Sequence, residues 1–114
     1  MLGPGDKAPS FALPDATTGA LVRDPWTDGH AVVAFFKTTC PVCQMVGPKL
    51  TALMEAGAPV IGVGQDPPAK LQAYANNHGQ RIPTVSESPP YELSTAFGLS
   101  VVPTLFRVDT AGVI

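Results

Sequence analysis

The stretch Phe35-Phe36-Lys37-Thr38-Thr39-Cys40-Pro41-Val42-Cys43 contains both cysteines of the chain, separated by two residues. An unbroken apolar run, residues 31–36, leads into it, as in a strand that is covered on both faces. A helical pattern over residues 44–56 leads away from it. A Cys-x-x-Cys motif between a strand and a helix is typical of a dithiol redox site. This stretch therefore predicts both the fold class and the chemistry.

The helix after the motif is expected to begin at the motif itself. Pro41 suits a first-turn position, because the N–H that proline lacks has no partner there. Pro48 lies inside the helical pattern and is expected to kink the helix, and Gly57 fits its C-terminal stop. The predicted buried face consists of four apolar residues at helical spacing: Val46, Leu50, Leu53 and Met54.

A second strand is predicted over residues 59–64, followed by a helix. Asp66 can cap this helix, with Pro67 in the first turn and Gly79 at the end. The strands at 31–36 and 59–64 should be parallel and joined by a right-handed crossover. The predicted inner face of the second helix comprises Leu71, Tyr74, Ala75 and His78.

The C-terminal third completes an alternation of strands and helices. Residues 84–86 predict a short strand, residues 90–97 a third helix closed by Gly98, and residues 104–108 a strand after Pro103. The order of elements predicts an α/β fold with a mixed central sheet flanked by helices. The last two residues, Val113 and Ile114, resemble half a hairpin, so we interpret the chain as truncated, with a C-terminal strand and helix missing.

The N-terminal third, residues 1–30, is interpreted as an extension of the single domain that spans residues 1–114. Residues 1–10 are expected to be a loose lead-in. Residues 11–15 and 20–22 predict a short edge hairpin around Gly19. A domain of this length can bury one hydrophobic core.

Composition limits the possible partners. Apolar residues make up 45% of the chain and charged residues 14%, with a net charge of −2 and no basic block. This pattern argues against nucleic-acid binding and against a polybasic membrane patch. No apolar run approaches the roughly 18 residues of a membrane span, and the N-terminus lacks a signal-peptide pattern. We therefore expect a cytoplasmic protein, or a periplasmic or other extracytoplasmic one if a leader was removed.

The chemistry requires a thiolate. A free thiol with a pKa near 8.5 is mostly protonated at neutral pH, but a helix N-terminus favours the anion. Cys40 has that position, so we expect it to attack a substrate disulfide and form a mixed disulfide, which the more buried Cys43 then resolves. Pro41 and Val42, between the cysteines, are expected to belong to the substrate-binding surface, where Pro41 stiffens the disulfide ring.

Three separated segments together resemble the thioredoxin-like superfamily, in its branch of thiol–disulfide oxidoreductases related to peroxiredoxins. The first is Gly5 to Asp15, which is similar to the N-terminal signature of this redoxin branch. The second is Phe35 to Cys43, with Pro48 in the helix that follows. The third is Ala96-Phe97-Gly98-Leu99 leading into Val102-Pro103-Thr104-Leu105-Phe106. The resemblance covers nearly the whole chain.

The resemblance implies that Pro103 is a cis-proline across from Cys40. It also implies that the backbone of Val102 pairs with the extended chain of a substrate near its disulfide. The expected substrate is a disulfide-containing protein or a small thiol. No bound cofactor is implied, so the electrons come from an external donor.

The sequence departs from the family pattern where a proton acceptor for Cys43 is expected. The position of the buried acid of thioredoxins is occupied by Ala34, and that of the glutamate of some extracytoplasmic relatives by Val46. Lys37, three residues before Cys40, could instead lower a thiol pKa. The alternative is that Lys37 is a solvated residue at the end of a strand.

Two rival functions stay open. A peroxiredoxin-like thiol peroxidase needs a threonine three residues before its reactive cysteine and a proline seven before it. Cys40 has Lys37 and Val33 at those positions, and Cys43 has Cys40 and Phe36.

The other rival is a copper or zinc binding protein that uses the cysteine pair. Its third ligand would have to be His78 or Met45, and neither has a metal-ligand spacing to the cysteines.

Overall fold

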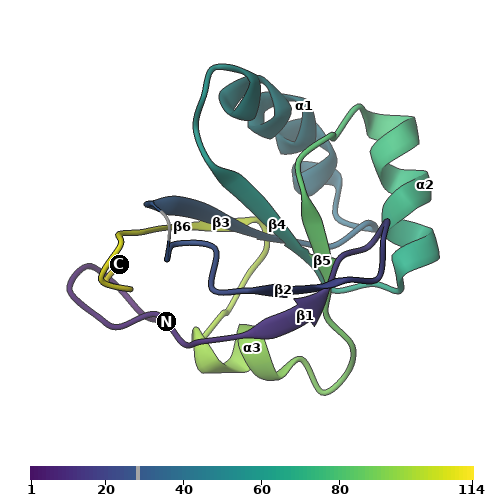
Figure 1. Ribbon diagram of the computed structural model, residues 1–114. Helices are drawn as coiled ribbons and strands as arrows, with labels where there is room; N and C mark the ends of the chain where they lie inside the picture. The colour runs from purple at the N-terminus through teal and green to yellow at the C-terminus, as the bar shows by residue number, and fades with distance from the viewer. Residues whose placement is uncertain (28) are drawn as a thin grey trace.

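The computed structural model describes residues 1–27 and 29–114. The central sheet has the strand order β5-β4-β3-β6, with β3, β4 and β5 parallel and β6 antiparallel to β3 (Figure 1). A separate antiparallel hairpin is formed by β1 and β2. The elements in chain order are β1 (Ala12–Pro14), β2 (Leu21–Arg23), β3 (Ala31–Phe36), α1 (Pro41–Glu55), β4 (Val60–Gly64), α2 (Pro68–His78), β5 (Thr84–Ser86), α3 (Glu92–Ala96) and β6 (Thr104–Val108).

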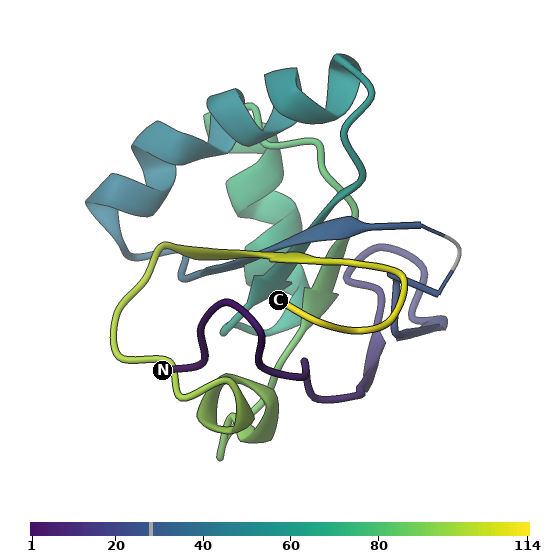
Figure 2. The ribbon, with the colours of Figure 1, turned by 90° about the vertical axis from the view of Figure 1, so that its left-hand side faces the viewer.

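The sheet is sandwiched between two unequal layers. Helices α1 and α2 cover one face, and α3 with the β1–β2 hairpin covers the other (Figures 1 and 2). Because side chains alternate along a strand, β3 serves both layers. Val33 and Phe35 belong to the cluster under α3 and the hairpin, whereas Ala34 and Phe36 belong to clusters under α1 and α2.

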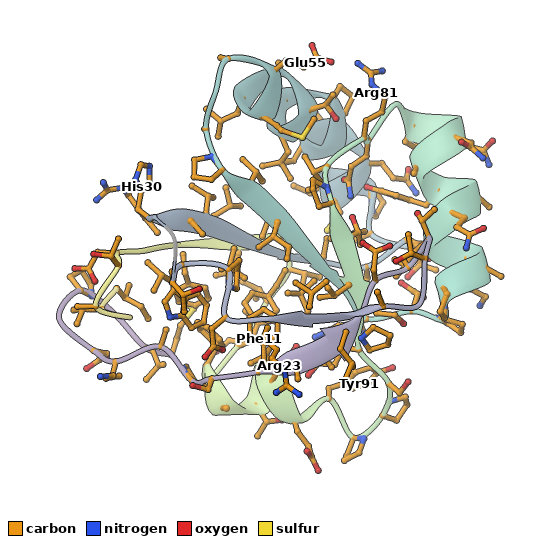
Figure 3. The ribbon with its side chains drawn as sticks, viewed as in Figure 1. Phe11, Arg23, His30, Glu55, Arg81 and Tyr91 are labelled. Atoms are coloured by element: carbon orange, nitrogen blue, oxygen red, sulfur yellow. The ribbon has the colours of Figure 1, made fainter. Side chains whose placement is uncertain are left out.

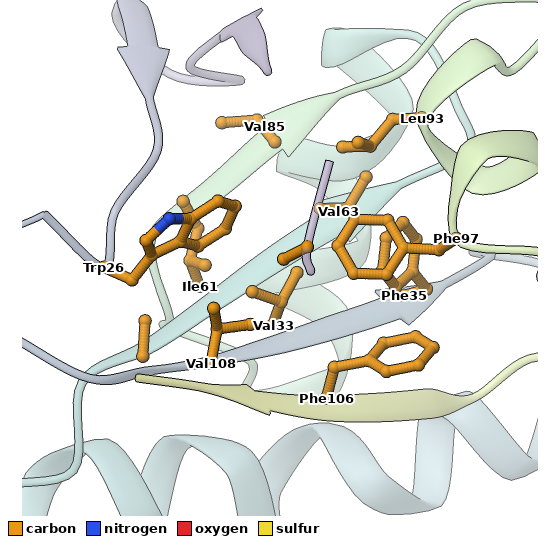
Figure 4. Packing of buried hydrophobic residues seen from close by; sticks show 12 residues of the cluster. Trp26, Val33, Phe35, Ile61, Val63, Val85, Leu93, Phe97, Phe106 and Val108 are labelled. Carbon is orange, nitrogen blue, oxygen red and sulfur yellow. The ribbon is translucent and has the colours of Figure 1, made fainter. Parts of the chain in front are cut away.

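The layer under α3 is one continuous apolar core (Figure 4). The ring of Phe35 lies 5.0 Å from that of Phe97 and 5.8 Å from that of Phe106, and the latter two are 4.8 Å apart. Each such aromatic pair adds about 0.5–1.5 kcal/mol to the stabilisation from buried area alone. Trp26 lies in the same cluster and is buried.

The layer under α1 and α2 packs closely because two residues of β4 are glycines. A Cβ atom at Gly64 would lie 2.3 Å from Cδ2 of Leu71 on α2. A Cβ at Gly62 would lie 3.0 Å from Cε1 of Phe36 and 3.1 Å from Cδ1 of Ile82. The missing side chain at Gly64 lets α2 approach β4, and the one at Gly62 leaves room for Phe36 and Ile82.

The prediction of a loose N-terminal lead-in was wrong. Leu2 N–H donates to the Phe97 carbonyl at 2.9 Å, and Ala8, which is buried, donates to the Gly112 carbonyl at 2.7 Å. The C-terminal residues pair with this same segment, since Ile114 N–H donates to the Asp6 carbonyl at 2.9 Å. Figure 2 shows the two ends of the chain side by side. Residues 113 and 114 thus have a partner within the described chain.

Three details of the helices also differ from the predictions. Asp66 does not cap α2, whose N-cap is Pro67. Helix α3 begins at Glu92 and not at residue 90, because Tyr91 has a φ of 57°, outside the right-handed helical region. Leu53 was predicted to be buried but is 42% exposed. Thr51 is buried on α1 instead, and its hydroxyl donates to the Gly47 and Gly79 carbonyls at 3.3 and 3.1 Å.

Other expectations are confirmed. Helix α1 begins at Pro41, the β1–β2 hairpin has its turn at Gly19, and α2 ends at Gly79 with a φ of 66°.

Arg81 pairs with Glu55 at the far end of α1 (Figure 3). Both side chains are more than half exposed, so the pair stabilises the fold little.

Candidate functional site: the dithiol at the start of helix α1

Strand β3 and helix α1 place the two sulfurs. Cys40 is the N-cap residue of α1, with an extended backbone (φ −87°, ψ 115°). Its sulfur accepts a hydrogen bond from the N–H of Cys43 at 3.3 Å. Cys43 lies one turn into the helix and is 2% exposed, whereas Cys40 is half-buried. The two thiols are therefore adjacent but have different environments.

These environments move the two pKa values in opposite directions. The pKa of Cys40 is lowered, first by the hydrogen bond from the Cys43 side chain and then by the Cys43 backbone N–H. Burial raises the pKa of Cys43 to about 12, and the hydrogen bond with Cys40 adds to the effect. Cys40 is therefore the thiol that ionises more readily, and Cys43 is the thiol that keeps its proton to higher pH.

The loop between α3 and β6 faces the dithiol. The peptide bond between Val102 and Pro103 is cis, as the resemblance implied. The Cys40 thiol donates to the Val102 carbonyl at 3.7 Å, which places this loop directly against the Cys40 sulfur. The structure thus brings together Cys40, Cys43, Val102 and Pro103, four of the residues singled out from the sequence.

An open surface surrounds Cys40. Pro41 is exposed, and Val42 and Val101 are 55% and 63% exposed. Next to Val102 the surface contains a hollow of about 210 Å³. Its lining residues are Lys37, Gln65, Leu99, Ser100, Val101 and Val102.

The Lys37 side chain was expected to lower a thiol pKa, but its ammonium lies over the ring of Tyr91. Its Nζ lies 5.9 Å from the centre of the Tyr91 ring, which Figure 3 shows on the α3 side of the sheet. Its charge is not among the causes that lower the Cys40 pKa. It is the Lys37 backbone that interacts with the Cys43 thiol and offsets part of the burial effect.

A polar network that sequence reasoning missed holds the loop before Cys40. The Asp66 carboxylate accepts from the Thr38 N–H at 2.8 Å, and Gln44 Nε2 donates to the Thr38 carbonyl at 3.1 Å. The Ser86 hydroxyl in turn donates to the Asp66 carbonyl at 2.7 Å. The sequence positions of Thr38, Asp66 and Ser86 could have indicated this network, since they lie at or just after the ends of β3, β4 and β5. The carboxyl ends of parallel strands meet at one edge of a sheet.

A second network at this edge includes a buried carboxylate, that of Glu87, which is 3% exposed. It accepts from the Ser94 N–H at 2.9 Å and the Ser94 hydroxyl at 2.6 Å, and Gln65 Nε2 donates to the same hydroxyl at 2.7 Å. These bonds tie the end of β5 to α3 and to the wall of the hollow beside Val102.

Tyr74 is the other residue that sequence reasoning did not assign to the site. It was expected on the inner face of α2, and it packs in the same buried cluster as Cys43. Its ring stacks on that of Phe36 with a centroid distance of 5.4 Å. Its hydroxyl is buried and has no hydrogen-bond partner among the described residues.

No group of three or more His, Cys, Asp or Glu side chains that could hold a metal ion occurs among residues 1–27 and 29–114. Of the two residues considered as a third ligand, Met45 is 71% exposed and His78 lies against the Tyr74 ring. In that same part of the chain, no helix has the length and apolar character needed to cross a membrane.

The sheet order, the strand–Cys-x-x-Cys–helix unit and the cis-proline loop beside the sulfurs define the class: this is a thiol-based redox enzyme with a thioredoxin-like fold. The family model described as AhpC/TSA family matches residues 4–114. The chain therefore belongs to the AhpC/TSA family.

Relatives of two kinds share this family likeness. A Mycobacterium tuberculosis protein named "Putative peroxiredoxin" is 30% identical over 99% of this chain and 74% of its own length. The "Thiol:disulfide interchange protein DsbE homolog" of Paracoccus denitrificans is 30% identical over 95% of this chain and 62% of its own length. The fold matches the thioredoxin domain of a thiol–disulfide oxidoreductase from Bacteroides vulgatus, with a TM-score of 0.86 at 20% identity, over 100% of this chain and 86% of that one.

Proposed function

We propose that the protein is a thiol–disulfide oxidoreductase that works through a Cys40–Cys43 dithiol. The observation that carries this proposal is the asymmetry of the pair: one sulfur is accessible at a helix N-terminus, and the other is buried one turn behind it. The lowered pKa of Cys40 and the raised pKa of Cys43 support a division into attacking and resolving thiols.

The proposed cycle has two exchange steps. The Cys40 thiolate attacks one sulfur of a substrate disulfide, forming a mixed disulfide and releasing the other substrate sulfur as a thiolate. Cys43 then loses its proton and attacks Cys40, so that the Cys40–Cys43 bond forms and the bond to the substrate breaks. The substrate leaves with two electrons and takes up two protons. An external thiol donor returns the enzyme to the dithiol, and no bound cofactor is needed.

The proposed substrate site lies along Val102 and Pro103. The Val102 carbonyl already receives a hydrogen bond from Cys40, so a backbone N–H next to a substrate disulfide could bond to the same carbonyl. The exposed side chains of Val42 and Val101 and the hollow beside Val102 support an extended polypeptide as the substrate. Lys37 is proposed only as part of the wall of this hollow.

The location of this activity follows from its chemistry. Stable disulfides form in oxidising compartments, and one relative is named a thiol:disulfide interchange protein. These two points favour the extracytoplasmic alternative over the cytoplasmic one.

The test is a redox titration in glutathione buffers, in which alkylation and mass measurement report on each cysteine. We expect both cysteines to convert together in one two-electron step. The Cys43→Ser variant should accumulate a mixed disulfide with glutathione at Cys40, and Cys40→Ser should not react. Absence of a Cys40–Cys43 disulfide at every potential would overturn the proposal.

A second candidate, a thiol peroxidase, is favoured by the relative named as a peroxiredoxin. Cys40 would then attack a peroxide, releasing water or an alcohol, and Cys43 would reduce the resulting sulfenic acid with loss of water. The residues before Cys40 do not follow the peroxiredoxin pattern, since Lys37 and Val33 replace the expected threonine and proline. The two activities are separated by comparing the rates at which hydrogen peroxide and a disulfide oxidise the reduced protein.

A further inference from the structure

The Tyr74 hydroxyl is a buried polar group that the fold does not use. Tyr74 is 4% exposed, and its hydroxyl has no hydrogen-bond partner among the described residues. Leaving a buried donor unpaired is unfavourable, so a group of this kind requires an explanation.

The surroundings of Tyr74 point to the dithiol. Tyr74 shares one buried cluster with Ala16, Phe36, Leu71 and Cys43, and Cys40 packs against the same cluster. Burial raises the pKa of Tyr74 to about 12, and the negative charges that Cys43 and Cys40 would carry as thiolates add to the effect. The hydroxyl therefore keeps its proton near neutral pH and is available to donate a hydrogen bond to a thiolate.

Among the causes that shift the Cys43 pKa, only backbone hydrogen bonds, from Lys37 and from Cys43 itself, favour its thiolate, and no side-chain cation contributes. Titratable side chains that contact the Tyr74–Cys43 cluster include Cys40 and His78. The hydrogen bond that Cys43 shares with Cys40 raises the Cys43 pKa, so it favours the neutral thiol and not the thiolate that resolution requires.

We propose that the Tyr74 hydroxyl donates a hydrogen bond to the Cys43 sulfur as that sulfur ionises to resolve the mixed disulfide. This inference rests on the proposed function and deepens it. The proton of Cys43 leaves through solvent and is recovered by the departing substrate sulfur, while Tyr74 keeps its own proton throughout. An interaction that is unmade in the resting state and made during reaction lowers the barrier without stabilising the ground state.

The test uses 5,5′-dithiobis(2-nitrobenzoate) with the reduced protein in a stopped-flow spectrometer. Attack by Cys40 releases one coloured thiolate, and resolution by Cys43 releases a second. Tyr74→Phe removes only the hydroxyl. We expect the first phase to be unchanged and the second to slow by between about tenfold and a hundredfold, as for loss of a hydrogen bond to a charged group. The pH midpoint of the second phase should rise.

The matched control is Tyr91→Phe, which removes the hydroxyl of the other tyrosine and should leave both phases unchanged. In that background, replacing Tyr74 by 3-fluorotyrosine gives a stronger donor and should speed the second phase. A urea titration of Tyr74→Phe should show no loss of stability, because the hydroxyl makes no bond in the resting fold.

The possible outcomes separate the two proposals. A wild-type protein with no second phase would overturn the exchange mechanism itself. A second phase that is present in the wild type and has the same rate and pH midpoint in Tyr74→Phe would overturn only the role of Tyr74. A loss of stability accompanied by changes in both phases would also overturn it, since the hydroxyl would then act structurally.

Discussion

The two faces of the central sheet are built differently, although β3 contributes to both. The face under α3 and the hairpin holds one continuous cluster of apolar side chains with three interlocked phenylalanine rings (Figure 4). The face under α1 and α2 is divided into two smaller clusters. It also holds the two buried side-chain atoms without a partner among the described residues, the Tyr74 hydroxyl and Gln80 Oε1.

This difference indicates a division of labour between stability and chemistry. A continuous apolar cluster can be packed without leaving polar groups unpaired, so it contributes most to the free energy of folding. The opposite face accepts glycines in a strand and an unpaired hydroxyl, and it is the face that contains Cys43. Natural proteins depart from local packing rules chiefly at functional sites.

The largest loss of folding stability is expected from Phe35→Ala, in the continuous apolar cluster under α3 and the hairpin. Phe35 is fully buried and contacts two other aromatic rings, so the substitution should lower the free energy of unfolding by about 3–5 kcal/mol. Urea denaturation of the reduced protein measures this change. Leu105→Ala, at a position 45% exposed on β6, is the control and should change stability by less than about 0.5 kcal/mol. Similar losses in the two variants would contradict the picture of a dominant core.

A smaller effect is expected from Gly64→Ala, on the face of the helices. The new Cβ would lie 2.3 Å from Leu71 Cδ2, so Leu71 must move, with a loss of about 1–3 kcal/mol. Leu71→Ala opens the space, and the double variant should lose less than the sum of the two single variants. Strict additivity in this double-mutant cycle would show that the close approach of α2 to β4 does not limit substitution at this position.

The smallest expected effect is a loss of folding stability at alkaline pH, which the raised pKa of Cys43 should cause. Its pKa is about 12 in the fold against 9.0 as the ordinary value, so the neutral thiol is favoured in the folded protein. The stabilisation is complete below pH 9 and is lost as pH rises from 9 toward 12. At pH 10 the loss should be about 1 kcal/mol.

This alkaline effect is measured by urea unfolding of Cys40→Ser and of Cys40→Ser/Cys43→Ser at several pH values under reducing conditions. The Cys40→Ser background removes the opposite contribution of the lowered Cys40 pKa, together with the part of the Cys43 shift that Cys40 causes, so the comparison isolates the effect of burial. The two variants should diverge between pH 9 and pH 10, and because Tyr74 is present in both, its ionisation in the unfolded state is common to the two curves. Parallel curves would mean that burial does not hold Cys43 neutral.

Much of the dithiol site could be predicted from the sequence because its signals are local. The apolar run of β3, the two cysteines and Pro41 specify a strand, a nucleophile and a helix start within a dozen residues of one another. Pro103 lies far along the chain, and only the family resemblance implied that it would face Cys40.

The remaining parts of the site depend on tertiary contacts that no local pattern encodes. Asp66 has the sequence context of a helix cap, but its carboxylate bonds to the Thr38 N–H across the sheet edge. Tyr74 has the spacing of an ordinary core residue, and only its place next to Cys43 makes its hydroxyl notable. The N-terminal residues carry no regular periodicity, so their pairing with residues 112–114 could not be anticipated.

That pairing has a consequence for how the domain reaches its fold. Ala8 and Gly112, and Asp6 and Ile114, are joined by hydrogen bonds between groups about a hundred residues apart in sequence. Contacts of such large sequence separation raise the contact order and slow folding, because the entropy of closing a long loop is lost before the contact stabilises the chain. The paired segments, residues 6–8 and 112–114, should therefore come together late in folding. In the folded protein, their amide hydrogens should exchange sooner than those of β3.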